Sequence, residues 1–400
     1  MKMSALLGSI EKLVASIYPS KEELATKLEG KRKLRIYLGI DPTSTTIHIG
    51  HTLPLRLLRS FQDAGHEVIL LIGDFTASIG DPSGRDKQRK PLTGKEIKEN
   101  FTSYENQVKR VLNYEKNPPK VIFNSKWWGS FKLGDFFNLA SKFTLAQLSE
   151  RDLFQERIKK GHPIAISEFL YPLLQGYDSV ELSVDIEVGA TDQTFNMLVG
   201  RQLLRTYKNK DKIVITTPLL EGTDGRKMSK TFGNTIELNL SPNDFYGKVM
   251  SIKDSLIEKY FTLLTNLEAK EVKTALVNGN PMIAKKRLAF ELVKQYFGES
   301  EAETSQREFE RVFQKGERTS NVIETKQPIS ILPKSYASLA TIVGATPSVS
   351  AAISLADNNG LKFDGQLVSD PRALFVNPNS TTGTIIDVGK RKSIKITWED

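Results

Sequence analysis

Two histidines stand three positions apart in the segment His48-Ile49-Gly50-His51, where an apolar stretch has ended and a helical pattern begins. Residues three apart share one face of a helix, so both imidazoles can address one ligand. The N–H groups of a helix N-terminus favour an anion such as a phosphate. Gly50 lacks a side chain and lets a planar ring approach the backbone. Alone, the tetrapeptide is equally compatible with two surface histidines at a helix start.

A second group of basic residues follows in Lys227-Met228-Ser229-Lys230-Thr231. It lies in a stretch rich in Gly, Asp, Ser and Asn, which predicts a mobile loop. Two lysines three apart bring two positive charges to one place, where they can neutralise phosphate oxygens. Taken alone, a solvated basic loop is the more ordinary interpretation.

These residues need a scaffold, and the hydrophobic pattern predicts one. Buried strands are expected at 34–40, 68–72, 121–123, 184–188 and 213–216. Helices are expected at 49–64, 93–112 and 191–205, with several more before residue 177. This alternation predicts an α/β fold with a parallel sheet and crossover helices. Residues 1–33 are expected to be helical.

The rest of the chain changes character twice. Residues 241–316 show amphipathic helical patterns and no strand pattern. From about residue 332, short turns and β-like runs predict a compact α+β unit. We therefore expect three parts, at 1–235, 236–325 and 332–400.

Composition limits the class of protein. The chain has 400 residues, of which 26% are charged and 39% hydrophobic, so a disordered or fibrous protein is excluded. It contains no cysteine and four histidines, which excludes disulfides and disfavours a metal cage. The excess of 56 basic over 47 acidic residues fits an ordinary surface or a polyanionic partner. No apolar run is long enough to span a membrane, so we expect a cytoplasmic protein.

The two basic segments gain meaning from their order on an alternating α/β chain. His48-Ile49-Gly50-His51 is identical to the HIGH signature of class I aminoacyl-tRNA synthetases, and 227–231 matches KMSKS in four of five places. Between them, 80–85, Tyr171-x3-Gln175-x2-Asp178 and 191–193 resemble the bacterial tyrosyl-tRNA synthetases of the KMSKS branch. The resemblance covers about residues 30–400. At Ala190 the family usually has glycine, next to the expected ribose contact.

The resemblance implies a Rossmann-like catalytic domain at 1–235, a helical anticodon-binding domain at 236–325 and a small RNA-binding domain at 332–400. The last resembles a domain of a ribosomal small-subunit protein. The implied reaction attaches L-tyrosine to tRNA(Tyr) through a tyrosyl-adenylate, with release of pyrophosphate. A homodimer is implied as well, whereas neither DNA nor a membrane is an expected partner.

The resemblance also assigns site residues. The catalytic donors are Thr43, His48, His51, Lys227 and Lys230. Tyrosine is bound by Tyr37, Asp81, Tyr171, Gln175, Asp178 and Gln193. ATP is bound by Gly39, Asp41, His48, Gly50, His51, Asp192, Lys227 and Lys230. RNA is contacted by Lys390, Arg391, Lys392 and Lys395.

The expected chemistry needs little beyond positioning. A carboxylate is already ionised at neutral pH and can attack the α-phosphate of ATP without a general base. No metal-binding cluster is evident, so Mg²⁺ is expected to arrive with ATP, largely hydrated.

Other functions share part of this pattern. Tryptophanyl-tRNA synthetase has the same fold and signatures, and a non-catalytic synthetase-like protein could bind RNA alone. A nucleotidyltransferase with a HIGH-like motif would need neither the helical part nor the basic C-terminus. Tyr37 and Asp178 suit a hydroxyl, which favours tyrosine over tryptophan.

Overall fold

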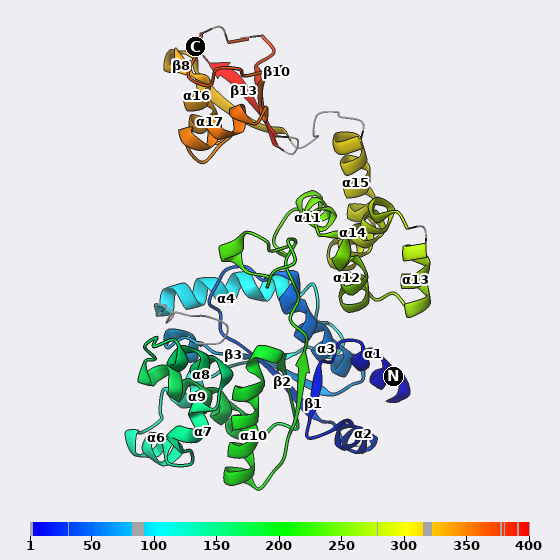
Figure 1. Ribbon diagram of the computed structural model, residues 1–400, viewed down its shortest axis with the longest axis vertical. Coiled ribbons are helices and arrows are strands. Elements are labelled where there is room, and N and C mark those ends of the chain that lie inside the picture. The colour runs from blue at the N-terminus through cyan, green and yellow to red at the C-terminus, as the bar shows by residue number, and fades with distance from the viewer. Residues whose placement is uncertain are drawn as a thin grey trace. The chain divides into compact units, whose positions relative to one another are not determined.

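The computed structural model describes residues 3–30, 32–81, 92–277, 279–314, 322–376, 378–379, 381–389 and 392–399. The chain divides into two compact units, 1–299 and 300–400. The α/β fold expected from the sequence is confirmed, and Figure 1 shows the elements of each unit. The predicted domain limits stay predictions.

The first unit is built on one six-stranded sheet. Its strands are β1 (Ser16–Tyr18), β2 (Arg35–Ile40), β3 (Glu67–Ile72), β4 (Lys120–Phe123), β5 (Ile186–Ala190) and β6 (Ile213–Thr217). The spatial order is β1-β6-β5-β2-β3-β4, and every neighbouring pair except β1 and β6 is parallel. The five predicted strands all exist, and β3 and β6 are almost wholly buried, as expected when helices cover both faces.

The expectation that residues 1–33 are helical is wrong in one place. Helices α1 (Met3–Glu11) and α2 (Lys21–Glu29) flank a short strand, β1, which pairs antiparallel with β6 along Ser16↔Thr216 to Tyr18↔Val214. Three residues carry too little periodicity to reveal a strand, and only the free edge of β6 supplies its partner.

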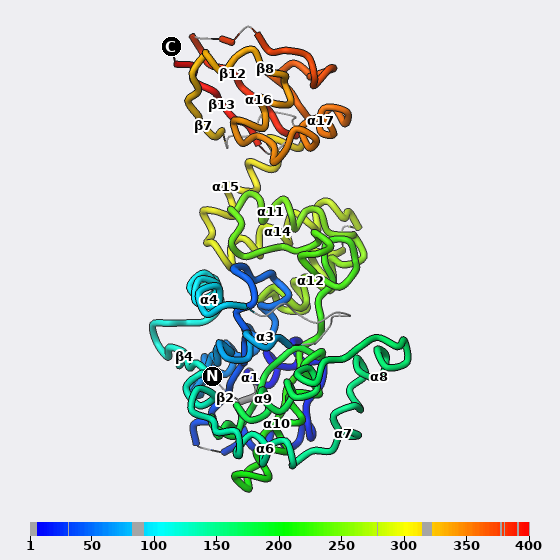
Figure 2. Tube along the Cα trace, turned by 90° about the vertical axis from the view of Figure 1, so that its left-hand side faces the viewer, coloured from blue at the N-terminus to red at the C-terminus, as the bar shows by residue number. Residues whose placement is uncertain are grey.

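Helices lie on both sides of this sheet (Figures 1 and 2). Tyr37, Ile69 and Leu71 face one side and pack with Leu182, near the end of α9. Alternation along the strands turns Leu38 and its neighbours to the opposite side, toward α3. The helices of this layered part are α3 (Thr52–Asp63), α4 (Gly94–Val108), α5 (Ser125–Trp128), α6 (Leu133–Ala140), α7 (Leu145–Ser149), α8 (Asp152–Lys159), α9 (Ile166–Leu182) and α10 (Thr194–Lys208).

The helical segment after residue 241 packs within the same unit. It contains α11 (Pro242–Met250), α12 (Ile257–Leu264), α13 (Ala269–Val277) and α14 (Pro281–Phe297). Tyr296 of α14 donates a hydrogen bond to Thr52 at the start of α3, at 3.1 Å. Arg56 of α3 donates to the carbonyl oxygen of Thr265 at 2.7 Å. This segment is therefore tied to the helix that follows the histidine pair.

The second unit begins at Ser300, the second residue of α15 (Glu299–Phe309), and continues into an α+β part. Its five-stranded sheet has the order β10-β9-β12-β13-β7, and its two helices are α16 (Tyr336–Ile342) and α17 (Val349–Asp357). The strands are β7 (Val322–Pro328), β9 (Leu361–Phe363), β10 (Gln366–Leu367), β12 (Thr384–Val388) and β13 (Lys392–Glu399), with a separate pair formed by β8 (Lys334–Ser335) and β11 (Leu374–Phe375).

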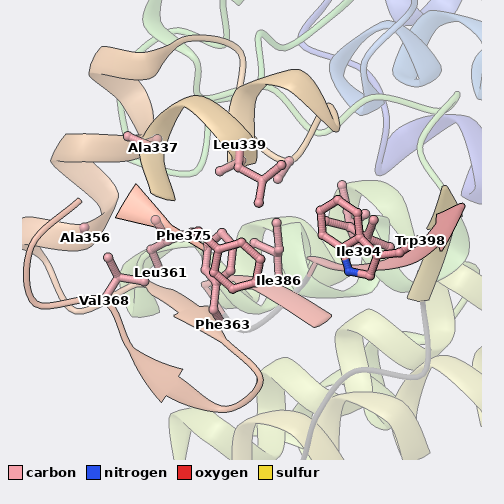
Figure 3. Close-up of a cluster of buried hydrophobic side chains, with 14 residues drawn as sticks. Ala337, Leu339, Ala356, Leu361, Phe363, Val368, Phe375, Ile386, Ile394 and Trp398 are labelled. Carbon is pink, nitrogen blue, oxygen red and sulfur yellow. The ribbon is translucent and has the colours of Figure 1, made fainter. Parts of the chain in front are cut away.

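A single core holds this α+β part together. Figure 3 shows Leu339, Phe363, Ile386 and their neighbours meeting between the helices and the sheet. The sequence placed the start of this part at about residue 332. Strand β7 lies before that residue but pairs in parallel with the last strand, β13, and so belongs to the same sheet.

Candidate active site

The site lies where the sheet changes its winding direction. Strands β2 and β5 are parallel neighbours, but the chain continues from β2 to β3 on one side and from β5 to β6 on the other. At such a switch point the two connections diverge and leave a crevice at the carboxyl ends of the strands. A cavity of about 370 Å³ occurs here.

Most of the residues that the sequence assigned to tyrosine, to ATP or to catalysis line this cavity. They are Gly39, Asp41, Thr43, His48, Gly50, His51, Asp81, Tyr171, Gln175, Asp178, Asp192, Gln193 and Lys227. Two assigned residues do not line it. Tyr37 is fully buried within the wall, where its hydroxyl lies 2.8 Å from that of Ser179, and Lys230 lies beside the mouth. Of the quoted segment 80–85, residues 82–85 lie outside the described residues.

Asp178 closes the deep end of the cavity. One of its carboxylate oxygens accepts hydrogen bonds from the indole N–H groups of Trp127 at 2.9 Å and Trp128 at 3.0 Å. The other accepts from the amide of Asn124 at 3.3 Å. Burial raises the pKa of Asp178 to about 8, although these three donors oppose the rise. The carboxyl group of Asp178 therefore faces the cavity with its orientation fixed.

A second set of polar groups surrounds the middle of the cavity. The Tyr171 hydroxyl donates to Asp41 at 2.7 Å, and the Gln193 amide donates to Asp81 at 2.8 Å. The amide of Asn196 donates to Gln175 at 2.9 Å and to Gln193 at 3.2 Å. Carboxylate and amide oxygens are thus gathered on one side, as a bound ammonium group would require.

The histidine pair sits at the mouth and begins a short 3₁₀ turn, Ile49–His51, that leads into α3. The backbone N–H of His48 donates to Nδ1 of His51 at 3.2 Å, so the proton of His51 resides on Nε2, which is the donor available to a ligand. Nδ1 of His48 is buried and has no hydrogen-bond partner among the described residues. The two rings stack at 3.7 Å. A Cβ at position 50 would lie only 3.0 Å from Nδ1 of His48, which explains Gly50.

Both imidazoles are neutral near pH 7. Burial lowers the pKa of His48 to about 2, and the neighbouring His51 and Lys230 add to this effect. His51 keeps an exposed surface, but protein atoms crowd its ring, and together with Lys230 they lower its pKa as well. The pair can therefore donate hydrogen bonds to phosphate oxygens without changing charge over the physiological range.

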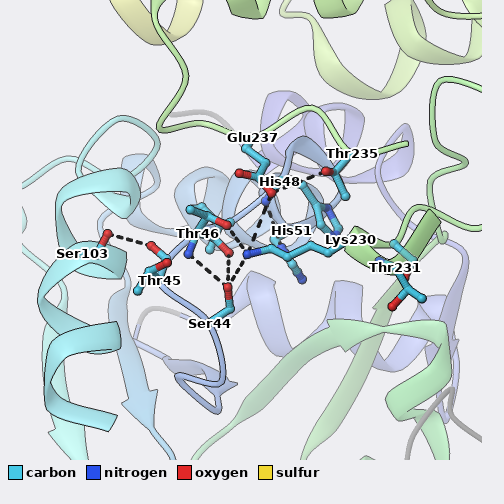
Figure 4. Close-up of polar contacts among 12 residues, drawn as sticks. Ser44, Thr45, Thr46, His48, His51, Ser103, Lys230, Thr231, Thr235 and Glu237 are labelled. Carbon is cyan, nitrogen blue, oxygen red and sulfur yellow. Dashed lines mark hydrogen bonds and ion pairs between the residues drawn. The ribbon is translucent and has the colours of Figure 1, made fainter. Parts of the chain in front are cut away.

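The two lysines of the loop are held on opposite sides of the mouth. Figure 4 shows the ammonium of Lys230 reaching Ser44 and Thr46. A carboxylate oxygen of Glu237 lies 3.9 Å from the same ammonium. Lys227 forms an ion pair with Asp192 at 3.3 Å. The structure thus brings 227–231 against the segment before the histidine pair, although the two are about 180 residues apart in the sequence.

Two of the basic residues assigned to RNA, Lys392 and Lys395, contact other residues of the second unit. Lys392 donates to the carbonyl oxygens of Gly344 at 2.5 Å and Ala345 at 3.1 Å. Lys395 lies 3.9 Å from Glu324. Lys390 and Arg391 lie outside the described residues.

Sequence reasoning missed several residues that shape the site. Glu187 lines the cavity, and Asn196, Asn124 and the two tryptophans orient its polar groups. Their local sequence carries no signal for this role, because each acts through a partner that is distant along the chain.

Within the described residues, no group of three His, Cys, Asp or Glu side chains is placed to hold a metal ion. No helix of the described part is long and apolar enough to cross a membrane.

Comparisons with known proteins place the chain in a family. Residues 29–314 match the family model described as tRNA synthetases class I (W and Y). The tyrosine–tRNA ligase of Carboxydothermus hydrogenoformans is 42% identical over 411 residues, covering 98% of both chains. That of Thermotoga maritima is 44% identical over 385 residues, covering 94% of both.

Solved structures give the same fold. A C-terminally truncated mitochondrial tyrosyl-tRNA synthetase from Aspergillus nidulans superposes with a TM-score of 0.66 at 24% identity, covering 77% of this chain and 93% of that one. The Archaeoglobus fulgidus tyrosyl-tRNA synthetase, crystallised with L-tyrosine, gives a TM-score of 0.61 at 23% identity, covering 76% of this chain and 100% of that one.

The pKa of Asp178 predicts a pH dependence of stability. Its folded value of about 8 exceeds the ordinary value of 3.8, so the folded state keeps a proton that the unfolded state releases between these limits. The stabilisation is complete below pH 4 and is lost as the pH rises toward 8. The unfolding free energy of the wild type, relative to Asp178→Asn, should fall by roughly 3 kcal/mol between pH 5 and 8. Urea unfolding at both pH values measures the difference, and a constant difference would contradict the raised pKa.

Proposed function

The chain belongs to the tyrosine–tRNA ligases of class I, and we propose that it charges tRNA(Tyr) with L-tyrosine, using ATP, at the carboxyl edge of its parallel sheet. The observation that carries this assignment is the buried carboxyl group of Asp178, held by three donors at the deep end of a cavity whose mouth carries both signatures. The tryptophan-specific alternative is not favoured, because an indole offers no hydroxyl for this end.

Tyrosine enters with its phenol first. Its hydroxyl meets Asp178 and the buried Tyr37, whereas its ammonium meets Asp81, Tyr171 and Gln175 in the middle of the cavity. Gln193 supports this middle region through its hydrogen bond to Asp81. This leaves the carboxylate of tyrosine directed toward the mouth, where the nucleotide must lie.

ATP occupies the mouth between the two signatures. We assign its adenosine to the backbone near Gly39 and Gly50 and its ribose to Asp192. Asp192 would give up its ion pair with Lys227 when it binds the ribose. Asp41 borders this region and already accepts hydrogen bonds from Thr76 and Tyr171. Mg²⁺ comes with ATP as part of the substrate, since the described residues offer no carboxylate cluster for a resident ion.

The first step is an in-line displacement. The carboxylate of tyrosine attacks the α-phosphate, and the bond to pyrophosphate breaks. Thr43, His48, His51, Lys227 and Lys230 act as donors to the phosphate oxygens as negative charge moves to the leaving group. In the second step, the 3′-terminal adenosine of tRNA(Tyr) attacks the adenylate carbonyl, and AMP leaves. We place this reaction in the cytoplasm, where tRNA is used.

We also propose a homodimer. Helix α6 exposes Leu133 and Phe137, which lie one turn apart, by 73% and 65%, and Leu145 at the start of α7 is 70% exposed. Large exposed apolar side chains at helical spacing mark an interaction surface.

The assignment of Asp178 is tested by substrate choice. Asp178→Ala should lower the preference for tyrosine over phenylalanine by at least tenfold, because the partner of the phenol hydroxyl is lost. Tyrosine-dependent exchange of pyrophosphate into ATP measures both substrates. Wild-type protein without such exchange would disprove the function, whereas an unchanged preference in the variant would disprove only the role of Asp178.

The role of Lys230 is tested by separating chemistry from binding. Lys230→Ala should slow adenylate formation by about 10²- to 10³-fold while tyrosine affinity changes little, because its charge acts mainly as pyrophosphate leaves. Pre-steady-state kinetics resolve the two quantities. Lys273→Ala, an exposed lysine on α13, is the control and should change neither. Weaker tyrosine binding with normal chemistry would refute the assignment.

The second unit is proposed to hold tRNA through Lys390, Arg391, Lys392 and Lys395. A chain ending after residue 321, which removes the whole sheet from β7 on, should activate tyrosine normally while its KM for tRNA rises about tenfold. Replacing the four basic residues by alanine should act in the same direction, and Arg372→Ala, an exposed arginine of this unit, should not. Full charging of tRNA by the shortened chain at physiological salt would refute this role.

The dimer surface is tested by one charge. Phe137→Asp should convert the protein to monomers in sedimentation velocity at micromolar concentration, because a carboxylate cannot be buried there without a partner. Val277→Asp, at a side chain 78% exposed on α13, is the matched control and should leave the association unchanged. Wild-type protein that sediments as a monomer would exclude the dimer.

A further inference from the structure

A lysine that no part of the proposed reaction uses lies behind the tyrosine pocket. Lys212 precedes β6 and is completely buried, which is exceptional for an ammonium group. It forms an ion pair with Glu187 of β5 and donates to the Ser179 hydroxyl of α9 at 2.5 Å. Glu187 lines the pocket, and Ser179 directly follows Asp178, so the ammonium stands one side chain behind the end that takes the phenol.

The surrounding backbone leaves space for this group. Helices α9 and α10 approach closely at Gly176 and Gly200. A Cβ at position 200 would lie 2.7 Å from Nζ of Lys212 and 2.9 Å from Oγ of Ser179. The two helices therefore pack around the ammonium and the hydroxyl and fix their positions.

The direction of the hydrogen bonds follows from the donors present. An ammonium only donates, so Oγ of Ser179 accepts from Lys212. Ser179 has one hydrogen to give, and it lies 2.8 Å from the Tyr37 hydroxyl but 3.4 Å from Glu187. The shorter contact favours donation to Tyr37. The Tyr37 hydroxyl then has its own hydrogen left to donate, and the Glu187 carboxylate is the acceptor that it meets in the protein itself.

When tyrosine is bound, its phenol oxygen competes with Glu187 for this hydrogen. Burial raises the pKa of Tyr37 well above its usual value, and the carboxylates of Glu187 and Asp178 add to the rise, so its hydroxyl keeps its proton. In its ionised form, Asp178 accepts the hydrogen of the tyrosine phenol, which leaves the phenol oxygen in need of a donor. The ammonium of Lys212 also lies over the Tyr37 ring, 5.7 Å from its centre, and restrains the ring through its face.

We propose that Lys212 is a positioning residue for substrate recognition: through Ser179 it orients the Tyr37 hydroxyl as the donor to the phenol oxygen of tyrosine, opposite the acceptor Asp178, with Glu187 as its counter-ion. This inference rests on the proposed function. It assigns the buried ion pair to specificity for the hydroxyl and adds no step to the reaction.

Three variants of the full-length protein test the relay. Ser179→Ala removes the relay and keeps the ion pair. Lys212→Met removes the ammonium, and Lys212→Met with Glu187→Gln removes both charges, so that no unpaired charge stays buried. Each should lower the ratio of kcat/KM for tyrosine over phenylalanine in pyrophosphate exchange by about tenfold, the effect of one hydrogen bond, and raise the KM for tyrosine. The KM for ATP should not change.

A buried hydroxyl elsewhere provides the control. Thr216→Val lies on β6, where the Thr216 hydroxyl donates to the carbonyl oxygen of Ser16, and it should leave the tyrosine preference intact. If Lys212→Met does not fold, Ser179→Ala decides the question alone.

The outcomes separate the two levels of the proposal. If the ion pair of Lys212 and Glu187 is purely structural, Ser179→Ala and the double variant will keep the full preference for tyrosine. That result overturns the proposed role of Lys212. Absence of tyrosine-dependent exchange in the wild type overturns the proposed function instead. A rise in the KM for ATP equal to that for tyrosine shows a general disturbance of the site and also overturns the inference.

Discussion

The site depends on the pairing of β2 with β5 as parallel neighbours whose connections run in opposite directions. This arrangement leaves a crevice at the carboxyl ends of the two strands, because neither crossover covers it. Asp41 follows β2 and Asp192 follows β5, so the two sides of the mouth come from segments about 150 residues apart in the sequence. A Rossmann-like sheet with another strand order would separate them.

Burial and charge change from the deep end of the cavity to its mouth. At the deep end, Asp178 and the pair of Glu187 with Lys212 are buried, and each has donors or a counter-charge that compensate for the loss of water. At the mouth, the groups are more exposed. The ammonium groups of Lys227 and Lys230 contact the side chains of Asp192 and Thr46, contacts that the nucleotide proposed above would replace. Nδ1 of His48 has no partner in the described structure. Fixed groups suit discrimination between amino acids, and exchangeable groups suit a nucleotide that must enter and leave.

The helix after the histidine pair connects the site with the helical segment of the same unit. Thr52, directly after His51, accepts a hydrogen bond from Tyr296, and Arg56 reaches the end of α12. A contact made on the helical segment would therefore act on α3, which begins directly after the histidine pair. The loop with the second signature is held against the same region through Lys230 (Figure 4).

Local spacing in the sequence determined the strands β2 to β6, the helix that carries Tyr171, Gln175 and Asp178, and the two signatures, because these features depend on neighbours within a few turns. The family follows from the same residues. Tertiary structure alone decided that β1 pairs with β6, that Tyr37 is buried beside Ser179 and that Lys212 contacts Ser179 and Glu187. Tyr37 and Ser179 are 142 positions apart, and Lys212 and Ser179 are 33 apart. Hydrogen bonds over such distances leave no periodic pattern in the sequence, since they arise only when packed strands and helices bring the side chains together.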